Sequence, residues 1–364
     1  MITPFFHRWE HRLASATKDR VVRPFEWGLD WLPANAESGG PGGSGGTDAD
    51  HGARVERWVE EVMRDTRTFF TPPPTADFEF EPARGAADGE AGTLRFPSAL
   101  ATPHAENNVV AARWFPSAAA QRPAGNGSPV DRGPVVLVLP QWNADAGGHL
   151  GLARLLARFG ISALRLSLPY HDVRMPPELK RADYIVSSNV VRTLQSCRQA
   201  VLDARRAVDW LSGQGFERIG ILGTSLGSCL SLLTTAHEPR IRAAALNHVS
   251  PWFADVVWRG LSTRHVRASL DGHVDLDRLR RIWMPISPMA YLDRLHDVRS
   301  LLVYARYDLT FPVDLSEDLV REFRRRGVPH EVAVLRCGHY TTGKAPFKFV
   351  DGWLLTRFLK HALR

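Results

Sequence analysis

Arg218-Ile-Gly-Ile-Leu-Gly-Thr-Ser-Leu-Gly-Ser-Cys-Leu230 is the stretch that decides the fold. A short apolar run, residues 219–222, precedes Gly223-Thr-Ser225-Leu-Gly227, and an apolar pattern with helical spacing follows. This order predicts a G-x-S-x-G motif on a tight turn between a buried strand and a helix. The serine of such a turn has strained backbone, so the positions two before and two after it must be nearly free of side chain. We therefore expect Ser225 to be a nucleophile rather than a helix cap.

Two later strand ends carry the residue types that activate a serine. An apolar strand at 301–304 leads to Asp308, and one at 332–335 leads to Gly338 and His339. A histidine can take the serine proton, and an acid can fix the tautomer of the imidazole. The order Ser225, Asp308, His339, each just past a strand, resembles the α/β-hydrolase superfamily over roughly residues 130 to 364.

The resemblance implies an α/β fold with a mostly parallel, eight-stranded sheet, helices on both faces and a helical cap insertion. We expect this hydrolase domain over 76–364, with the cap at about 250–291 and a Pro- and Gly-rich loop at 118–132. Residues 1–75 are expected to form an aromatic-rich, helical N-terminal extension. Its Gly-rich linker is placed at about 37–52, and an amphipathic helix at 53–69.

The oxyanion hole and the pocket are assigned by position. Leu226, the residue after the nucleophile, offers one backbone N–H, and the loop after the strand at 135–139 offers the second. The superfamily usually has His-Gly there, whereas this chain has Pro140-Gln141-Trp142, so both Trp142 and Gln141 stay candidates. Residues expected to line the substrate pocket, from strand ends and the cap, are Tyr170, His171, His248 and Trp252.

Composition bounds the class of protein. The 364 residues are 44% hydrophobic and 23% charged, which is ordinary for a soluble globular chain, and there is neither a membrane-length apolar run nor a signal peptide pattern. Three cysteines without metal spacing predict buried free thiols and a reducing, cytoplasmic location. The net charge of +7 indicates either a solvated basic surface or peripheral contact with an anionic membrane. We find no nucleic-acid motif, and no metal or organic cofactor is implied.

These patterns predict an enzyme, a serine hydrolase that cleaves a carboxylic ester or related acyl bond through an acyl-enzyme. Two alternatives stay open: an acyltransferase that uses the same triad, and a non-catalytic binding protein on a hydrolase scaffold. A small-molecule or lipid acyl ester is the expected substrate. Acyl chain length and oligomeric state are not determined by the sequence, because a fold analogy gives a reaction class and never a substrate.

Overall fold

The computed structural model describes residues 2–34, 46–83, 85, 89–122 and 131–364, which form one continuous nine-stranded sheet in the order β1-β2-β3-β5-β4-β6-β7-β8-β9. The antiparallel opening strands are β1 (Glu79–Pro82), β2 (Gly92–Pro97) and β3 (Val109–Phe115). The parallel strands are β5 (Ser162–Leu166), β4 (Val135–Leu139), β6 (Ile219–Thr224), β7 (Ile241–Asn247), β8 (Arg299–Ala305) and β9 (His330–Leu335).

The mostly parallel sheet is confirmed, but the expected count of eight strands is wrong by one. The edge strand β1 has four residues and pairs with β2 alone in the described sheet. All four of its residues are exposed, and two of them are glutamates. A short, charged edge strand of this kind resists pairing with other chains and adds little to the core.

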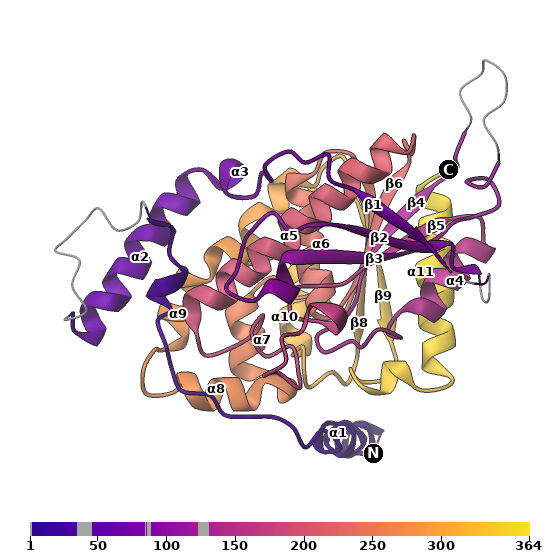
Figure 1. Cartoon of the computed structure of the whole chain (residues 1–364). Helices are drawn as coiled ribbons and strands as arrows, with labels where there is room; N and C mark the ends of the chain where they lie inside the picture. The colour runs from indigo at the N-terminus through magenta and orange to yellow at the C-terminus, as the bar shows by residue number, and fades with distance from the viewer. Residues whose placement is uncertain (1, 35–45, 84, 86–88, 123–130) are drawn as a thin grey trace.

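Alternate residues of the central strand β4 face two separate cores. Val135, Leu137 and Leu139 belong to the core under α5 (Val190–Gly213), α6 (Leu226–His237) and α10 (Val313–Arg325). Val136 and Val138 belong to the core under α4 (Leu150–Arg158) and α11 (Phe347–Ala362). The uninterrupted apolar run of β4 is therefore buried on both faces, and Figure 1 shows the sheet between these two groups of helices.

Short helices fill the chain between β7 and β8, where a cap was expected: α7 (Phe253–Arg259), α8 (Arg264–Leu270) and α9 (Leu276–Ile282). Two arginines of α9 form ion pairs within the protein. Arg280 binds Asp255 of α7 through two hydrogen bonds of 2.8 and 2.6 Å, and Arg278 binds Glu56 at 3.2 Å. The Arg280 pair therefore joins α9 to α7, and the Arg278 pair fastens the insertion to the N-terminal extension.

The N-terminal extension packs on the rest of the chain. It contains α1 (Ile2–Ser15), α2 (Asp48–Arg64) and the short α3 (Thr66–Phe69). Figure 1 shows α2 beside α9, far from α1. Helix α2 begins at Asp48 rather than near residue 53, because Thr47 and Asp50 form a capping box at its N-terminus. Residues 37–45 of the expected linker and 123–130 of the expected loop lie outside the described residues.

Two sequence-based expectations about the chain as a whole can be compared with the fold. Cys197, Cys229 and Cys337 are buried and carry free thiols, as predicted. In the part of the chain that the structure describes, no helix combines the length and the apolar character needed to cross a bilayer.

Candidate active site

The turn between β6 and α6 has the strained geometry that the glycine spacing predicts. Ser225 has φ 57° and ψ −121°, a left-handed conformation that side chains rarely adopt. A Cβ on Gly223 would collide with the carbonyl of Gly227, and a Cβ on Gly227 would collide with the carbonyl oxygens at the end of β4. Both glycines are thus required by close backbone approach, and the Ser225 side chain lies at the N-terminus of α6.

Ser225, His339 and Asp308 are brought together in one hydrogen-bonded chain. Nε2 of His339 lies 3.0 Å from Oγ of Ser225, and Nδ1 of His339 lies 2.9 Å from Oδ2 of Asp308. Backbone N–H groups of Thr310 and Phe311 donate to the other carboxylate oxygen at 2.8 and 2.7 Å. The acid is therefore held rigidly, and the imidazole is oriented with Nε2 toward the serine.

The charges of this chain act on one another. Burial alone would raise the pKa of Asp308, but the charge of His339 and the hydrogen bonds from His248 and His339 hold that pKa well below its usual range. Burial opposes the charged form of His339, yet the charge and hydrogen bond of Asp308, aided by Glu10, raise its pKa above the usual value. His339 is thus a stronger base than a solvated histidine.

His248 is a second histidine on the same carboxylate. Its Nδ1 lies 3.0 Å from Oδ2 of Asp308, its ring centroid is 4.5 Å from that of His339, and the residue is buried. Burial and the neighbouring His339 lower the pKa of His248, so it is neutral and donates its Nδ1 proton. The atoms of His248, Asp308 and His339 that could bind a metal ion lie within 4.8 Å of one another. The Nδ1 atoms of both histidines, however, already donate to Asp308.

The three proposed oxyanion-hole residues, Leu226, Gln141 and Trp142, all line the cavity beside Ser225. Leu226 is the first residue of α6, so its N–H has no acceptor within the helix. The next loop amide along, that of Asn143, donates to Nε2 of His171 at 2.9 Å and is therefore not free. This leaves the amides of Gln141 and Trp142 as the two candidates that the sequence also named.

The sequence predicts that His171 and Tyr170 line the pocket, but neither residue is part of the cavity lining. Nδ1 of His171 donates to the carbonyl of Pro169 at 2.9 Å, which leaves Nε2 as the acceptor for Asn143. Burial lowers the pKa of His171 to about 4, consistent with this neutral tautomer. His171 therefore supports the oxyanion loop from behind instead of contacting the cavity.

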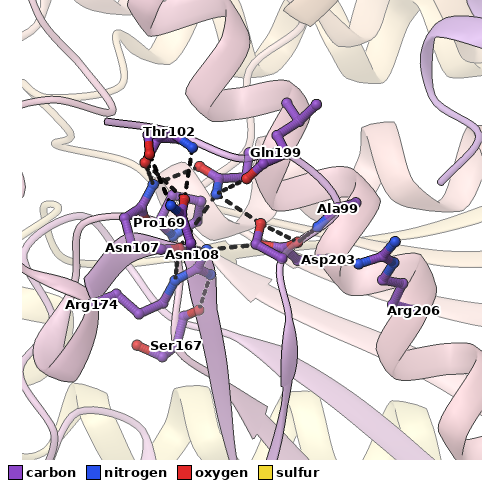
Figure 2. A network of polar contacts seen from close by, with 12 residues as sticks. Ala99, Thr102, Asn107, Asn108, Ser167, Pro169, Arg174, Gln199, Asp203 and Arg206 are labelled. Atoms are coloured by element: carbon purple, nitrogen blue, oxygen red, sulfur yellow. Dashed lines mark hydrogen bonds and ion pairs between the residues drawn. The ribbon is translucent and has the colours of Figure 1, made fainter. Parts of the chain in front are cut away.

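A buried polar network holds the loop that contains these two residues. Figure 2 shows Arg174 binding Asp203 of α5, at 2.9 Å, and the carbonyls of Ser167 and Asn107. The side chain of Asn107 in turn accepts the N–H of Tyr170 at 3.0 Å. The network turns Tyr170 into the core, and a strand-end position alone could not have indicated this. Trp252 likewise packs beside the cavity, on Cys229, Val256, Phe311 and Leu315, without lining it.

The cavity over Ser225 has a volume of about 620 Å³. Apolar side chains from the insertion and from the loop after β8 form one wall, and these are Phe253, Val256, Val257 and Phe311. Polar residues also line the cavity, among them His149 before α4 and Lys348 and Asp351 of α11. Thr17 and Arg20 of the N-terminal extension complete the lining, and Arg20 donates to the hydroxyl of Tyr340 at 3.0 Å.

Glu10 of α1 is a contributor to the site that the sequence did not reveal. This fully buried carboxylate accepts the backbone N–H groups of Tyr340 and Thr341, each at 2.9 Å, and the Thr341 hydroxyl, also at 2.9 Å. The adjacent Gly338 leaves the space that Glu10 occupies. Helix α1 therefore fixes the loop that carries His339, although about 330 residues separate the two.

Several solved structures have a fold similar to that of this chain. Acetyl xylan esterase from Paenibacillus sp. R4 is similar with a TM-score of 0.61 and 14% identity, covering 91% of this chain and 100% of that one. Acetyl xylan esterase 1 from a Thermoanaerobacterium species has a TM-score of 0.59 and 13% identity, covering 85% and 94%. Pyrococcus horikoshii acylaminoacyl peptidase has a TM-score of 0.56 and 14% identity, covering 78% of this chain but 42% of that one.

The chain therefore has the α/β-hydrolase fold, as the order of strands and site residues predicted. This chain spans less than half the length of the peptidase that it matches. No protein-family model matches the sequence, and no curated protein matches it. At such low identity the likeness concerns the fold, so activity has to be argued from the site itself.

Proposed function

We propose that the protein is a serine hydrolase that cleaves carboxylic esters through a covalent acyl-enzyme. The observation that carries this proposal is the unbroken hydrogen-bonded chain from Oγ of Ser225 through His339 to Asp308, on a turn that exposes the serine to a cavity. A helix-capping serine needs neither the strained backbone nor a histidine at 3.0 Å.

In the first half of the reaction, Oγ of Ser225 attacks the acyl carbonyl while Nε2 of His339 takes the hydroxyl proton. The tetrahedral oxyanion is held by the amide of Leu226 together with that of Gln141 or Trp142. His339 then gives its proton to the leaving oxygen as the carbonyl–oxygen bond breaks. Asp308 stays ionised throughout, because it accepts four hydrogen bonds, and stabilises the imidazolium.

In the second half, water takes the place of the leaving alcohol. His339 accepts a proton from this water, which attacks the acyl carbon, and returns it to Ser225 as the acid is released. An ester is favoured over an amide here because an alkoxide leaves far more readily than an amide anion, so the ester makes the smaller demand on His339 as an acid. Solved relatives named as esterases and one named as a peptidase are compatible with either bond.

The first experiment is labelling with a fluorophosphonate, followed by intact mass and peptide mapping. We expect one adduct, on Ser225, that is lost in Ser225→Ala and strongly slowed in His339→Ala. Ser228→Ala is the matched control and should still be labelled on Ser225. Ser228 lies three residues further along, in α6, and its hydroxyl donates to backbone carbonyls. Labelling that persists in Ser225→Ala, or full esterase activity of that variant on nitrophenyl acetate, would contradict the proposal.

A further inference from the structure

A row of polar side chains crosses the ends of β6 and β7 next to the nucleophile. Thr224, the residue before Ser225, pairs in register with Asn247 of β7, so the two are neighbours on adjacent strands. His149 extends the row on one side, with Nε2 2.9 Å from the Thr224 hydroxyl. Asp351 of α11 extends it on the other, accepting the side-chain amide of Asn247 at 2.9 Å. All four residues line the same cavity as Ser225.

Three atoms of this row have unused hydrogen-bonding capacity. Among the residues that the structure describes, Nδ1 of His149, Oδ1 of Asn247 and Oδ1 of Asp351 are buried and find no hydrogen-bond partner. Asn247, a residue of the cavity lining, is 2% exposed, and its side-chain NH2 donates to Asp351, so the atom without a partner is its acceptor oxygen. Buried polar atoms without partners are costly, and three of them in one row indicate a site that a polar group completes.

The chemistry of the row selects among possible groups. An apolar group would leave the three atoms unsatisfied. A carboxylate or phosphate would meet the lone pairs of Asn247, and of Asp351 when it is ionised, with further lone pairs. An ammonium would face Lys348, which lines the same cavity one helical turn from Asp351. A hydroxyl is neutral and both donates and accepts, so it fits the amide oxygen and either protonation state of the carboxyl.

We propose that the row formed by His149, Thr224, Asn247 and Asp351 binds adjacent hydroxyl groups of the substrate, so that the preferred ester belongs to a polyol or a sugar-like alcohol. This inference rests on the proposed ester hydrolysis, since it specifies the substrate of that same site. The hydroxyls donate to Asn247 and Asp351, and the ester carbonyl lies over Ser225, one residue along the chain from Thr224.

Two esters that share an acetyl group test the idea, namely glycerol 1-monoacetate and propyl acetate, which differ by two hydroxyls. We expect the wild type to favour the glycerol ester in kcat/KM, and Asp351→Leu to lower that preference about tenfold, the effect of one lost hydrogen bond. Asp351→Asn, which keeps an acceptor oxygen, should retain most of the preference. Val256→Ala, on the apolar wall, is the control and should affect both esters alike.

Asn247→Ala, which removes the other acceptor of the row, carries the test if Asp351→Leu does not fold. An equal loss for both esters in these variants would make the row structural and would overturn the proposal. Equal kcat/KM values of the wild type for the two esters would also overturn the proposal, because the row would then hold water only.

A binding measurement separates this proposal from failure of the catalytic one. The Ser225→Ala protein is titrated with each ester by ligand-observed NMR, with and without Asp351→Leu. Tighter binding of the glycerol ester that depends on Asp351 supports the hydroxyl site even if no ester is hydrolysed. Equal binding of the two esters overturns it, whether or not Ser225 proves to be reactive.

Discussion

Replacing Glu10 by alanine is expected to damage the His339 loop from the far end of the chain. The substitution removes three hydrogen bonds to a buried carboxylate and leaves the N–H groups of Tyr340 and Thr341 without partners. Hydrogen bonds to charged groups contribute about 1.5–3 kcal/mol each, and partial relaxation reduces their sum. We therefore expect the free energy of unfolding to fall by about 3–5 kcal/mol, the size seen when one partner of a buried charged pair is removed.

Catalysis should respond separately from stability. A misplaced His339 should lower kcat for nitrophenyl acetate by about tenfold to a hundredfold, the cost of an error of about 1 Å in position. Loss of the Glu10 charge also removes one influence that raises the pKa of His339, so the acid limb of the kcat/KM profile should move to lower pH. Both readouts are measured on folded protein, well below the melting temperature.

Two variants serve as controls for this prediction. Glu10→Gln keeps one acceptor oxygen for Thr341, so its losses should be smaller, about 1–2 kcal/mol. Phe6→Leu weakens the docking of α1, where Phe6 stacks on Tyr307 with centroids 4.6 Å apart, but keeps the Glu10 carboxylate. If Glu10→Ala matched Phe6→Leu in lost stability and kept wild-type kcat and pH profile, Glu10 would be an anchor for α1 alone and the reasoning would be refuted.

Three further predictions concern His248, Asp351 and the exposed aromatic residues of α11. His248→Ala removes a hydrogen bond from Asp308, which makes the carboxylate more basic and should raise the pKa of His339, so the acid limb of the kcat/KM profile should move to higher pH. His248→Asn keeps a donor and should return the acid limb to its wild-type position. Identical acid limbs in all three proteins would count against this role of His248. Burial raises the pKa of Asp351 from 3.8 to about 7, so the folded state keeps a proton that the unfolded chain releases, and unfolding free energy should fall as pH rises between these values, by at most about 1.4 kcal/mol per pH unit. Asp351→Asn should therefore gain stability relative to wild type from pH 4.5 to about 7 in urea titrations, and a constant difference would contradict the assignment. Phe349 and Trp353 are 65% and 52% exposed on α11, and Lys348 and Arg357 lie over their rings. Vesicles that contain anionic lipid should therefore carry the wild type upward in a flotation experiment at low salt, but not Trp353→Ser. If the wild type did not float with vesicles at low or high salt, membrane contact would be discarded.

Some features of the site follow directly from local sequence. The elbow could be predicted from the G-x-S-x-G spacing, since Gly223 meets the backbone of Gly227 and Gly227 meets the end of the neighbouring strand β4. Asp308 and His339 could be predicted because the carboxyl ends of parallel strands meet at one edge of the sheet, so residues that follow apolar strands converge there. In both cases the information is short-range periodicity plus the direction of the strands.

Other features depend on which surfaces meet after folding. Glu10 lies in an amphipathic helix with ordinary charges, and nothing near it in the chain shows that its partner is the loop after His339. His171 follows a strand just as His339 follows one, but the buried network around Arg174 turns it behind the oxyanion loop. A side chain's direction at a strand end is set by long-range contacts, which periodicity does not encode.

The sequence by itself determined the mostly parallel sheet, the strand-to-helix turn at Ser225 and the order of the three residues that gather there. Only the tertiary structure decided that Asp308 serves two histidines and that an N-terminal helix fixes the histidine loop. It also decided that Asn247 and Asp351 meet beside the nucleophile. The physical reason is the range of the forces involved: hydrophobic periodicity acts along a few residues, whereas a buried hydrogen bond needs two partners that the chain brings together only once it has folded.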